Sequence, residues 1–229
     1  MNTSETHVHR SGVMNVEGCE CVHNARVFAL TDSIRGAKFP LSTDLDRLDG
    51  TLTDGIKALA NSEAGSGHDQ WLTGVIVQFD LTFSNKAWVE AERYHFLDFV
   101  SSQSTMHRIT RFDLDSAYNE YVDPRIIEVM KQKVSAFNKR NDSPQLSMFK
   151  DTPEEAERIA ELNRREYLEI LYSNPAGFLL TARMTTNYRQ LKTIYAQRKN
   201  HRLPEWRTFC KWIETLPNSD LIVGGNKNG

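Results

Sequence analysis

The stretch VIVQFDLTF, residues 75–83, decides the fold. Its apolar residues Val75, Val77, Phe79, Leu81 and Phe83 alternate with Ile76, Gln78, Asp80 and Thr82. Successive side chains of a β-strand point to opposite faces, so this period of two predicts a strand with one buried face. The chain therefore contains a sheet, and the segments around it must supply what covers that face.

Those segments are predicted to be mainly helical. Apolar residues three or four apart predict helices over 45–60, 86–100 and 178–200, and a further helix around Trp206. Asp123-Pro124 and Thr152-Pro153-Glu154-Glu155 predict two helix starts, because each places a capping side chain before a proline at the first helical position. We expect a short strand at 27–30 and an exposed loop at 138–151. Several helices packed on a small sheet define an α+β fold.

The composition sets limits on the class of protein. The chain has 229 residues, 39% of them hydrophobic and 25% charged, with a formal charge of -2, which is ordinary for a soluble globular protein. A charge near zero gives no sign of a nucleic-acid polymer or a membrane surface as partner. No apolar run approaches the roughly 18 residues that a bilayer span needs, so we expect a cytoplasmic protein. We expect a flexible arm over 1–25, one domain over 26–216 and a disordered tail over 217–229.

Three cysteines, Cys19, Cys21 and Cys210, make a disulfide framework unexpected. Their number is odd, and the first two are too close in sequence to bridge easily. A group of possible metal ligands lies near the N-terminus: His7, His9, Cys19, Cys21 and His23. Their spacing matches no zinc pattern, so no metal site is predicted.

Polar side chains are dense after the predicted strand. The cluster consists of His68, Arg93, His95, Ser101, Gln103, Ser104 and Arg108. Arginine offers a fixed fork for phosphate, and serine and glutamine offer orientable donors and acceptors, so the cluster could line a pocket for a phosphorylated ligand. The alternative is a solvated loop in which Ser101-Ser102-Gln103-Ser104 forms turns.

A second cluster lies near the C-terminus. Asn187, Leu191, Ile194, Tyr195 and Arg198 share one face at helical spacing. An arginine on an apolar stripe is unusual, so Asn187 and Arg198 could point into a ligand site. A snorkelling arginine, or a structural ion pair with a glutamate, explains the pattern equally well.

These motifs resemble the core of the flavin-dependent thymidylate synthases. Arg93-Tyr94-His95 is similar to that family's Arg-His-Arg triplet, and Ser101, Gln103, Ser104 and Arg108 are similar to the serine-rich motif that follows it. His68 falls where the family has a histidine before the strand. Asn187-Tyr188-Arg189-Gln190-Leu191 followed by Arg198 resembles the C-terminal Asn-x-Arg-x-Leu motif. The resemblance covers roughly residues 27–213 and is weak over 110–150.

The resemblance implies a small, mostly antiparallel sheet with packed helices, a homotetramer, and FAD as cofactor. It implies transfer of a one-carbon unit from methylenetetrahydrofolate to a uridine nucleotide, with NADPH as reductant. The flavin contacts would be His68, Arg93, His95, Asn187 and Arg189. The pyrimidine nucleotide would lie among Ser101, Gln103, Ser104, Arg108 and Arg198, with Gln103, Ser104 and Arg108 closest to the chemistry.

Some positions depart from the family's pattern. Tyr94 occupies the centre of the triplet, Met106 replaces a serine, and Leu171 stands where the family offers a phosphate-binding arginine. Losing an arginine fork removes charge-assisted bonds to phosphate. The alternative interpretation is therefore a non-catalytic homologue that keeps the fold and the oligomer and binds a nucleotide without turnover.

Overall fold

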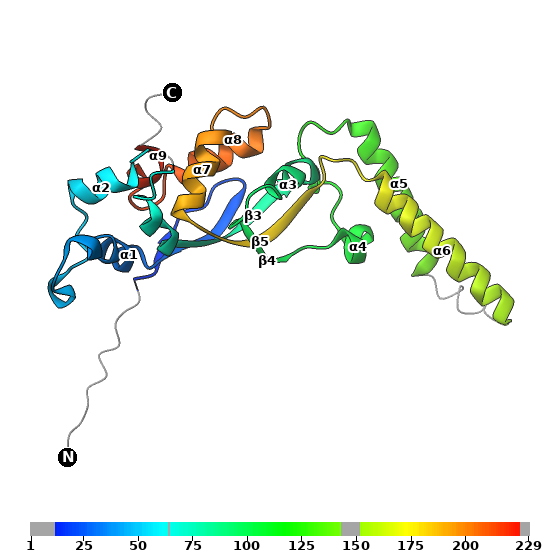
Figure 1. Ribbon diagram of the computed structural model, residues 1–229. Helices are drawn as coiled ribbons and strands as arrows, with labels where there is room; N and C mark the ends of the chain where they lie inside the picture. Colours follow the sequence, from blue (N-terminus) through cyan, green and yellow to red (C-terminus); the bar gives the residue numbers. More distant parts are fainter. Residues whose placement is uncertain (1–11, 64, 143–151, 225–229) are drawn as a thin grey trace, which may run out of the picture. The chain divides into compact units, whose positions relative to one another are not determined.

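The computed structural model describes residues 12–63, 65–142 and 152–224, which form two compact units (Figure 1). The first unit takes its described residues from Met1–Thr82, Glu90–Ser101 and Ala182–Gly229. The second takes them from Phe83–Val89 and Ser102–Thr181. His7, His9, most of the expected loop at 138–151 and the end of the predicted tail lie outside the described residues.

The described strands form one five-stranded sheet. Its strands are β1 (Met14–Val16), β2 (Val22–Phe28), β3 (Ile76–Ser84), β4 (Asp98–Ser102) and β5 (Leu179–Asn187), in the order β1-β2-β3-β5-β4. β1 pairs with β2, and β2 with β3, in antiparallel fashion. The predicted α+β fold with a small, mostly antiparallel sheet is confirmed. Residues 12–25, expected in a flexible arm, supply β1 and the first half of β2.

The decisive strand is confirmed as β3. Val77, Phe79 and Leu81 are fully buried, whereas the side chains between them are only partly covered. Helix α8 (Pro204–Ile213) packs on the buried face, where the ring of Phe79 lies 5.6 Å from that of Phe209 and 5.0 Å from that of Trp212. The predicted helix around Trp206 is therefore also confirmed.

Two of the predicted helices are much shorter in the structure. The segment 45–60 holds a 3-10 helix at Leu45–Arg47 and then α2 (Asp54–Ala60), which begins where Thr53 accepts a hydrogen bond from the Ile56 N–H. Gly50 lies between these two elements, and the close approach to Thr31 requires a glycine there, because a Cβ would lie 2.1 Å from Cγ2 of Thr31. The segment 86–100 holds α3 (Asn85–Ala91) and then β4, because Phe96 has a left-handed φ of 67° that no helix continues.

The prediction of one helix over 178–200 is wrong in its first half. Residues Leu179–Asn187 form β5, and α7 begins only at Tyr188 and runs to Arg198. β-Branched residues such as Thr181 and Thr185 favour a strand here, and Asn187 then caps the helix. The strand predicted at 27–30 is the end of β2, and α1 (Leu30–Gly36) follows it. A short helix, α9 (Asp220–Val223), ends the described chain.

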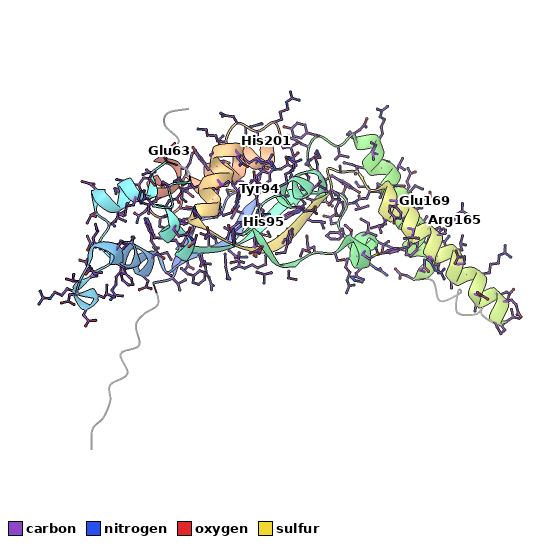
Figure 2. All side chains as sticks on the ribbon, viewed as in Figure 1. Glu63, Tyr94, His95, Arg165, Glu169 and His201 are labelled. Carbon is purple, nitrogen blue, oxygen red and sulfur yellow. The ribbon has the colours of Figure 1, made fainter. Side chains whose placement is uncertain are left out.

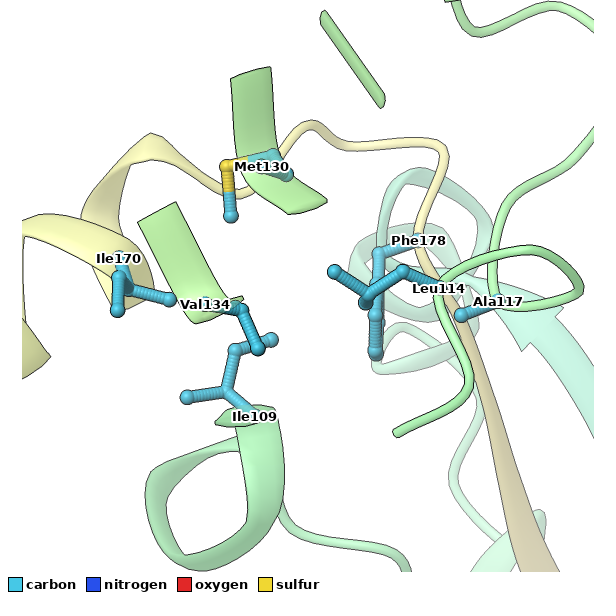
Figure 3. Close-up of a cluster of buried hydrophobic side chains, with 7 residues drawn as sticks. All are labelled: Ile109, Leu114, Ala117, Met130, Val134, Ile170 and Phe178. Atoms are coloured by element: carbon cyan, nitrogen blue, oxygen red, sulfur yellow. The ribbon is translucent and has the colours of Figure 1, made fainter. Parts of the chain in front are cut away.

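The second unit is a helical cluster with its own core. Both predicted starts are confirmed: Asp123 accepts from the Arg125 N–H at the start of α5 (Pro124–Asn141), and Thr152 from the Glu155 N–H at that of α6 (Pro153–Ser173). A short helix, α4 (Thr105–Arg108), also belongs to this unit. Helices α5 and α6 contribute side chains to a cluster of buried hydrophobic residues, shown in Figure 3. Its members are Ile109, Leu114, Ala117, Met130, Val134, Ile170 and Phe178. Among the described helices, none combines the length and apolarity that crossing a bilayer requires.

Candidate functional site

The first unit contains a pocket of about 900 Å³ beside α7. Its walls come from the segment after α2, from the 3-10 helix at Gln70–Gly74, from Phe96 and from one side of α7. Its lining includes Glu63, Asp69, Phe96, Asn187, Arg189 and Lys192. Two residues predicted as flavin contacts, Asn187 and Arg189, are thus brought together in one cavity.

A buried carboxylate organises the charges of this pocket. Asp69 is 5% exposed and forms ion pairs with Nε of Arg189 at 3.0 Å and with Nζ of Lys192 at 2.9 Å. Burial alone would raise the pKa of Asp69, but the bonds from Lys192 and Arg189 outweigh it and lower that pKa. Arg189 also donates to Oε1 of Gln70 at 2.7 Å, so its guanidinium is fixed against the pocket wall.

The start of α7 adds a second electrostatic element. Asn187 ends β5 and accepts a hydrogen bond from the Gln190 N–H at 2.8 Å, which makes it the N-cap of α7. Helix N-termini carry partial positive charge, and Arg189 and Lys192 stand in the first turns. Asp69 and Glu63 offset these cations, so the pocket suits a ligand with both apolar and anionic parts rather than a free highly charged anion.

The other residues predicted to contact flavin lie near this pocket in sequence. His68 is exposed and directly precedes Asp69. The triplet Arg93-Tyr94-His95 lies between α3 and β4, with Arg93 and His95 exposed and Tyr94 buried. Figure 2 labels Tyr94 and His95. The next residue along, Phe96, lines the pocket and exposes 64% of its surface. Flavin contacts by His68, Arg93 and His95 stay predictions.

Arg198 has partners inside the first unit. Its Nη1 forms an ion pair with Oε2 of Glu90 at 2.9 Å, its Nε donates to the Tyr94 hydroxyl at 2.6 Å, and its guanidinium lies 4.9 Å from the Trp206 ring. His201 joins the group: its Nδ1 accepts from the Leu203 N–H at 3.2 Å, and its Nε2 lies 2.7 Å from Nη1 of Arg198 and 3.2 Å from Oε2 of Glu90. These contacts show the structural ion pair with a glutamate that was one interpretation of Arg198; a contact to substrate stays a prediction.

The predicted nucleotide contacts occupy the end of β4 and the start of α4. Ser101 is exposed in β4, within the first unit. Gln103, Ser104 and Arg108 follow in the second unit, where Arg108 is exposed and its N–H donates to the carbonyl of Ser104. Oε1 of Gln103 accepts from the Thr181 N–H at 2.9 Å, and the Gln103 N–H donates to the Thr181 carbonyl at 3.0 Å. The side chain of Gln103 is therefore held in one orientation.

Sequence reasoning missed several residues of the pocket. Asp69, Lys192 and Phe96 were not singled out, although Lys192 follows Arg189 by three positions and so shares its helix face. Asp69 pairs with side chains about 120 positions away, which no local pattern reveals. In the described part of the chain, no group of three or more His, Cys, Asp and Glu side chains is placed to hold a metal ion.

Comparison with known proteins places this fold in a class. Neither the family models nor the curated proteins match the sequence. Among solved structures, the fold is that of the flavin-dependent thymidylate synthase ThyX. One similar structure is ThyX from Helicobacter pylori complexed with FAD and dUMP, with a TM-score of 0.59, 12% identity, and coverage of 93% of this chain and 100% of that one. A second structure of the same enzyme with FAD and dUMP also gives a TM-score of 0.59 at 12% identity, over 92% of this chain and 98% of that one.

Proposed function

We propose that this chain is a divergent flavin-dependent thymidylate synthase-like enzyme. It would transfer a one-carbon unit from methylenetetrahydrofolate to a uridine nucleotide, with FAD as hydride carrier and NADPH as reductant. The fold likeness over nearly the whole of both chains supports this proposal. The observation that carries it is the pocket in which Asn187 and Arg189, two positions of the resembling motif, lie together at the start of α7.

The residues of the pocket fit a flavin nucleotide. A cavity of about 900 Å³ is within the usual range for ligand sites, roughly 300–1,000 Å³. The start of α7, Arg189 and Lys192 favour a phosphate group, and the exposed ring of Phe96 offers a surface for a planar ring. Bound flavin, once reduced by NADPH, would supply the hydride; the role of these side chains is to hold and orient the cofactor.

Residues around the start of α4 would hold the nucleotide. Arg108 is exposed and offers a bidentate fork for phosphate. Because Oε1 of Gln103 accepts from the Thr181 N–H, the amide nitrogen of that side chain is the group that would donate to a pyrimidine carbonyl. Ser104, in the same unit, would supply a hydroxyl group, and the nucleotide contact by Ser101 stays a prediction. Gln103, Ser104 and Arg108 are the residues we assign closest to the reacting ring, and the homotetramer and the cytoplasmic location belong to the same proposal.

Binding of FAD by the purified full-length chain tests the proposal. We expect the wild type to quench FAD fluorescence on titration. Arg189→Ala should weaken binding by roughly 10- to 150-fold, the range for about 1.5–3 kcal/mol from a hydrogen bond to a charged group. Arg202→Ala, an exposed arginine of the same unit outside the pocket lining, is the matched control and should bind as the wild type does.

The alternative gives a different pattern in the same experiment. A nucleotide-binding protein without turnover would be stabilised thermally by dUMP, and Arg108→Ala would abolish that stabilisation, yet the protein would take up no FAD. A chain that binds neither FAD nor dUMP would leave only the shared fold.

A further inference from the structure

Two cysteine thiols face each other at the tip of the β1–β2 hairpin. The Cys19 N–H donates to the Val22 carbonyl at 2.8 Å, and the Val22 N–H donates back to the Cys19 carbonyl at 3.3 Å, which closes a tight turn. Gly18 permits this turn, because a Cβ at that position would lie 2.2 Å from the Val22 oxygen. The turn brings Sγ of Cys19 to 3.7 Å from Sγ of Cys21.

The hairpin is fastened on both sides of this pair. Nε1 of Trp212 in α8 donates to the Glu17 carbonyl at 3.1 Å, and the Thr82 N–H in β3 donates to the Cys21 carbonyl at 2.9 Å. The two thiols are therefore held near each other by the fold rather than by chance encounters of a free segment. Both are free thiols in this structure.

The two thiols differ in their exposure to solvent and in their pKa. Cys19 is half-buried and reachable from solvent, whereas Cys21 is 6% exposed. The hydrogen bond with Cys21 stabilises the Cys19 thiolate and lowers the pKa of Cys19 to about 6. The same bond, together with burial, raises the pKa of Cys21. Cys19 is thus the nucleophile at neutral pH, and Cys21 keeps its proton.

We propose that Cys19 and Cys21 form a redox-active dithiol that is oxidised by hydroperoxides to an intramolecular disulfide. An accessible nucleophilic cysteine beside a second, resolving thiol is the arrangement that such chemistry needs. A disulfide has an S–S distance of about 2.05 Å, so the sulfur atoms must approach by roughly 1.7 Å, a side-chain movement. This site goes beyond the proposed function, which uses no cysteine.

The reaction balances in two steps. The Cys19 thiolate attacks one peroxide oxygen and breaks the O–O bond; the sulfur becomes a sulfenic acid and, with one proton, the other oxygen leaves as water or an alcohol. The Cys21 sulfur then attacks the Cys19 sulfur, the S–S bond forms, and the hydroxyl of the sulfenic acid leaves as water with the Cys21 proton. The peroxide is reduced by two electrons and the two thiols are oxidised by two.

The test uses the full-length chain, reduced and then treated with a small excess of hydrogen peroxide. Remaining thiols are labelled with a maleimide under denaturing conditions, and the intact mass is measured. We expect two of the three thiols to become unreactive, a mass loss of two hydrogen atoms, full reversal by dithiothreitol, and a cross-linked peptide that joins Cys19 to Cys21. Cys210 is the internal control, because burial raises its pKa to about 12 and leaves it inert.

Single substitutions distinguish the two roles. Cys21→Ser should stop at the sulfenic acid of Cys19, which dimedone captures, whereas Cys19→Ser should resist the same dose of peroxide. Cys210→Ser should behave as the wild type does. Three reactive thiols after treatment, a bridge between two chains, or equal oxidation of Cys19→Ser and the wild type would each overturn the proposal. Peptide mapping of the wild type decides the question even if a variant does not fold.

Discussion

At the scale of a single residue, Arg198 is held by three different interactions at once. It pairs with Glu90, donates to Tyr94 and packs on the ring of Trp206. The side chains of Arg198 and Glu90 are only 9% and 14% exposed. Removing one partner of such a pair leaves the other buried without compensation, which is costly.

Arg198→Ala is therefore expected to lower the free energy of unfolding by about 3–5 kcal/mol, the usual cost of breaking a buried ion pair. The midpoint of urea unfolding measures it, with the exposed Arg202→Ala as control, which should stay within about 0.5 kcal/mol of the wild type. A variant that keeps full stability yet loses affinity for dUMP would contradict this expectation. It would support instead the substrate contact that the sequence suggested.

Asp69 leads to a prediction about how the stability of the protein depends on pH. Its lowered pKa in the folded state means that its contribution to stability is complete above its unfolded pKa, about 3.9, and is lost as pH falls through the folded value. Acid titration of the wild type should show this loss below about pH 4. Asp69→Asn should be less stable at neutral pH and should lack this part of the acid dependence, whereas the exposed Asp46→Asn should keep it. If the stability of Asp69→Asn and of the wild type fell in parallel with pH, the proposed contribution of Asp69 to stability would be ruled out.

At the scale of the element, the start of α6 can be tested alone. Thr152 accepts a hydrogen bond from the Glu155 N–H at 3.3 Å and is followed by Pro153. Thr152→Ala should cost about 1 kcal/mol, since it removes the cap, and Thr152→Ser should cost little because the hydroxyl remains. Circular dichroism during thermal unfolding measures the change. Equal losses in the two variants would show that the methyl group, not the hydrogen bond, matters.

Elements whose signals are local could be predicted from the sequence. β3, α5, α6 and α8 follow from an alternating pattern, from two caps and from an aromatic stripe. β4 and β5 could not, because the strand state of residues such as Thr181 depends on pairing with distant segments. The same limit holds for the site: Asn187 and Arg189 belong to a recognisable motif, whereas Asp69 joins them only through the tertiary fold.

At the scale of the whole molecule, the chain divides into two compact units. The first unit packs α8 on the sheet through Phe79, Phe209 and Trp212 and carries the pocket. The second has its own cluster around Met130 and Phe178. Binding of a cofactor in the pocket would act first on the unit that contains it, because a ligand stabilises the folded state that it binds.

The tryptophan residues also divide unequally between the units. Trp71, Trp206 and Trp212 belong to the first unit, and Trp88 alone to the second, while the long helices α5 and α6 belong to the second. Tryptophan fluorescence would thus follow mainly the first unit, whereas the amide ellipticity of helices follows both units, because α7 and α8 lie in the first and α5 and α6 in the second. A melt recorded by tryptophan fluorescence alone would therefore describe mainly one of the two units.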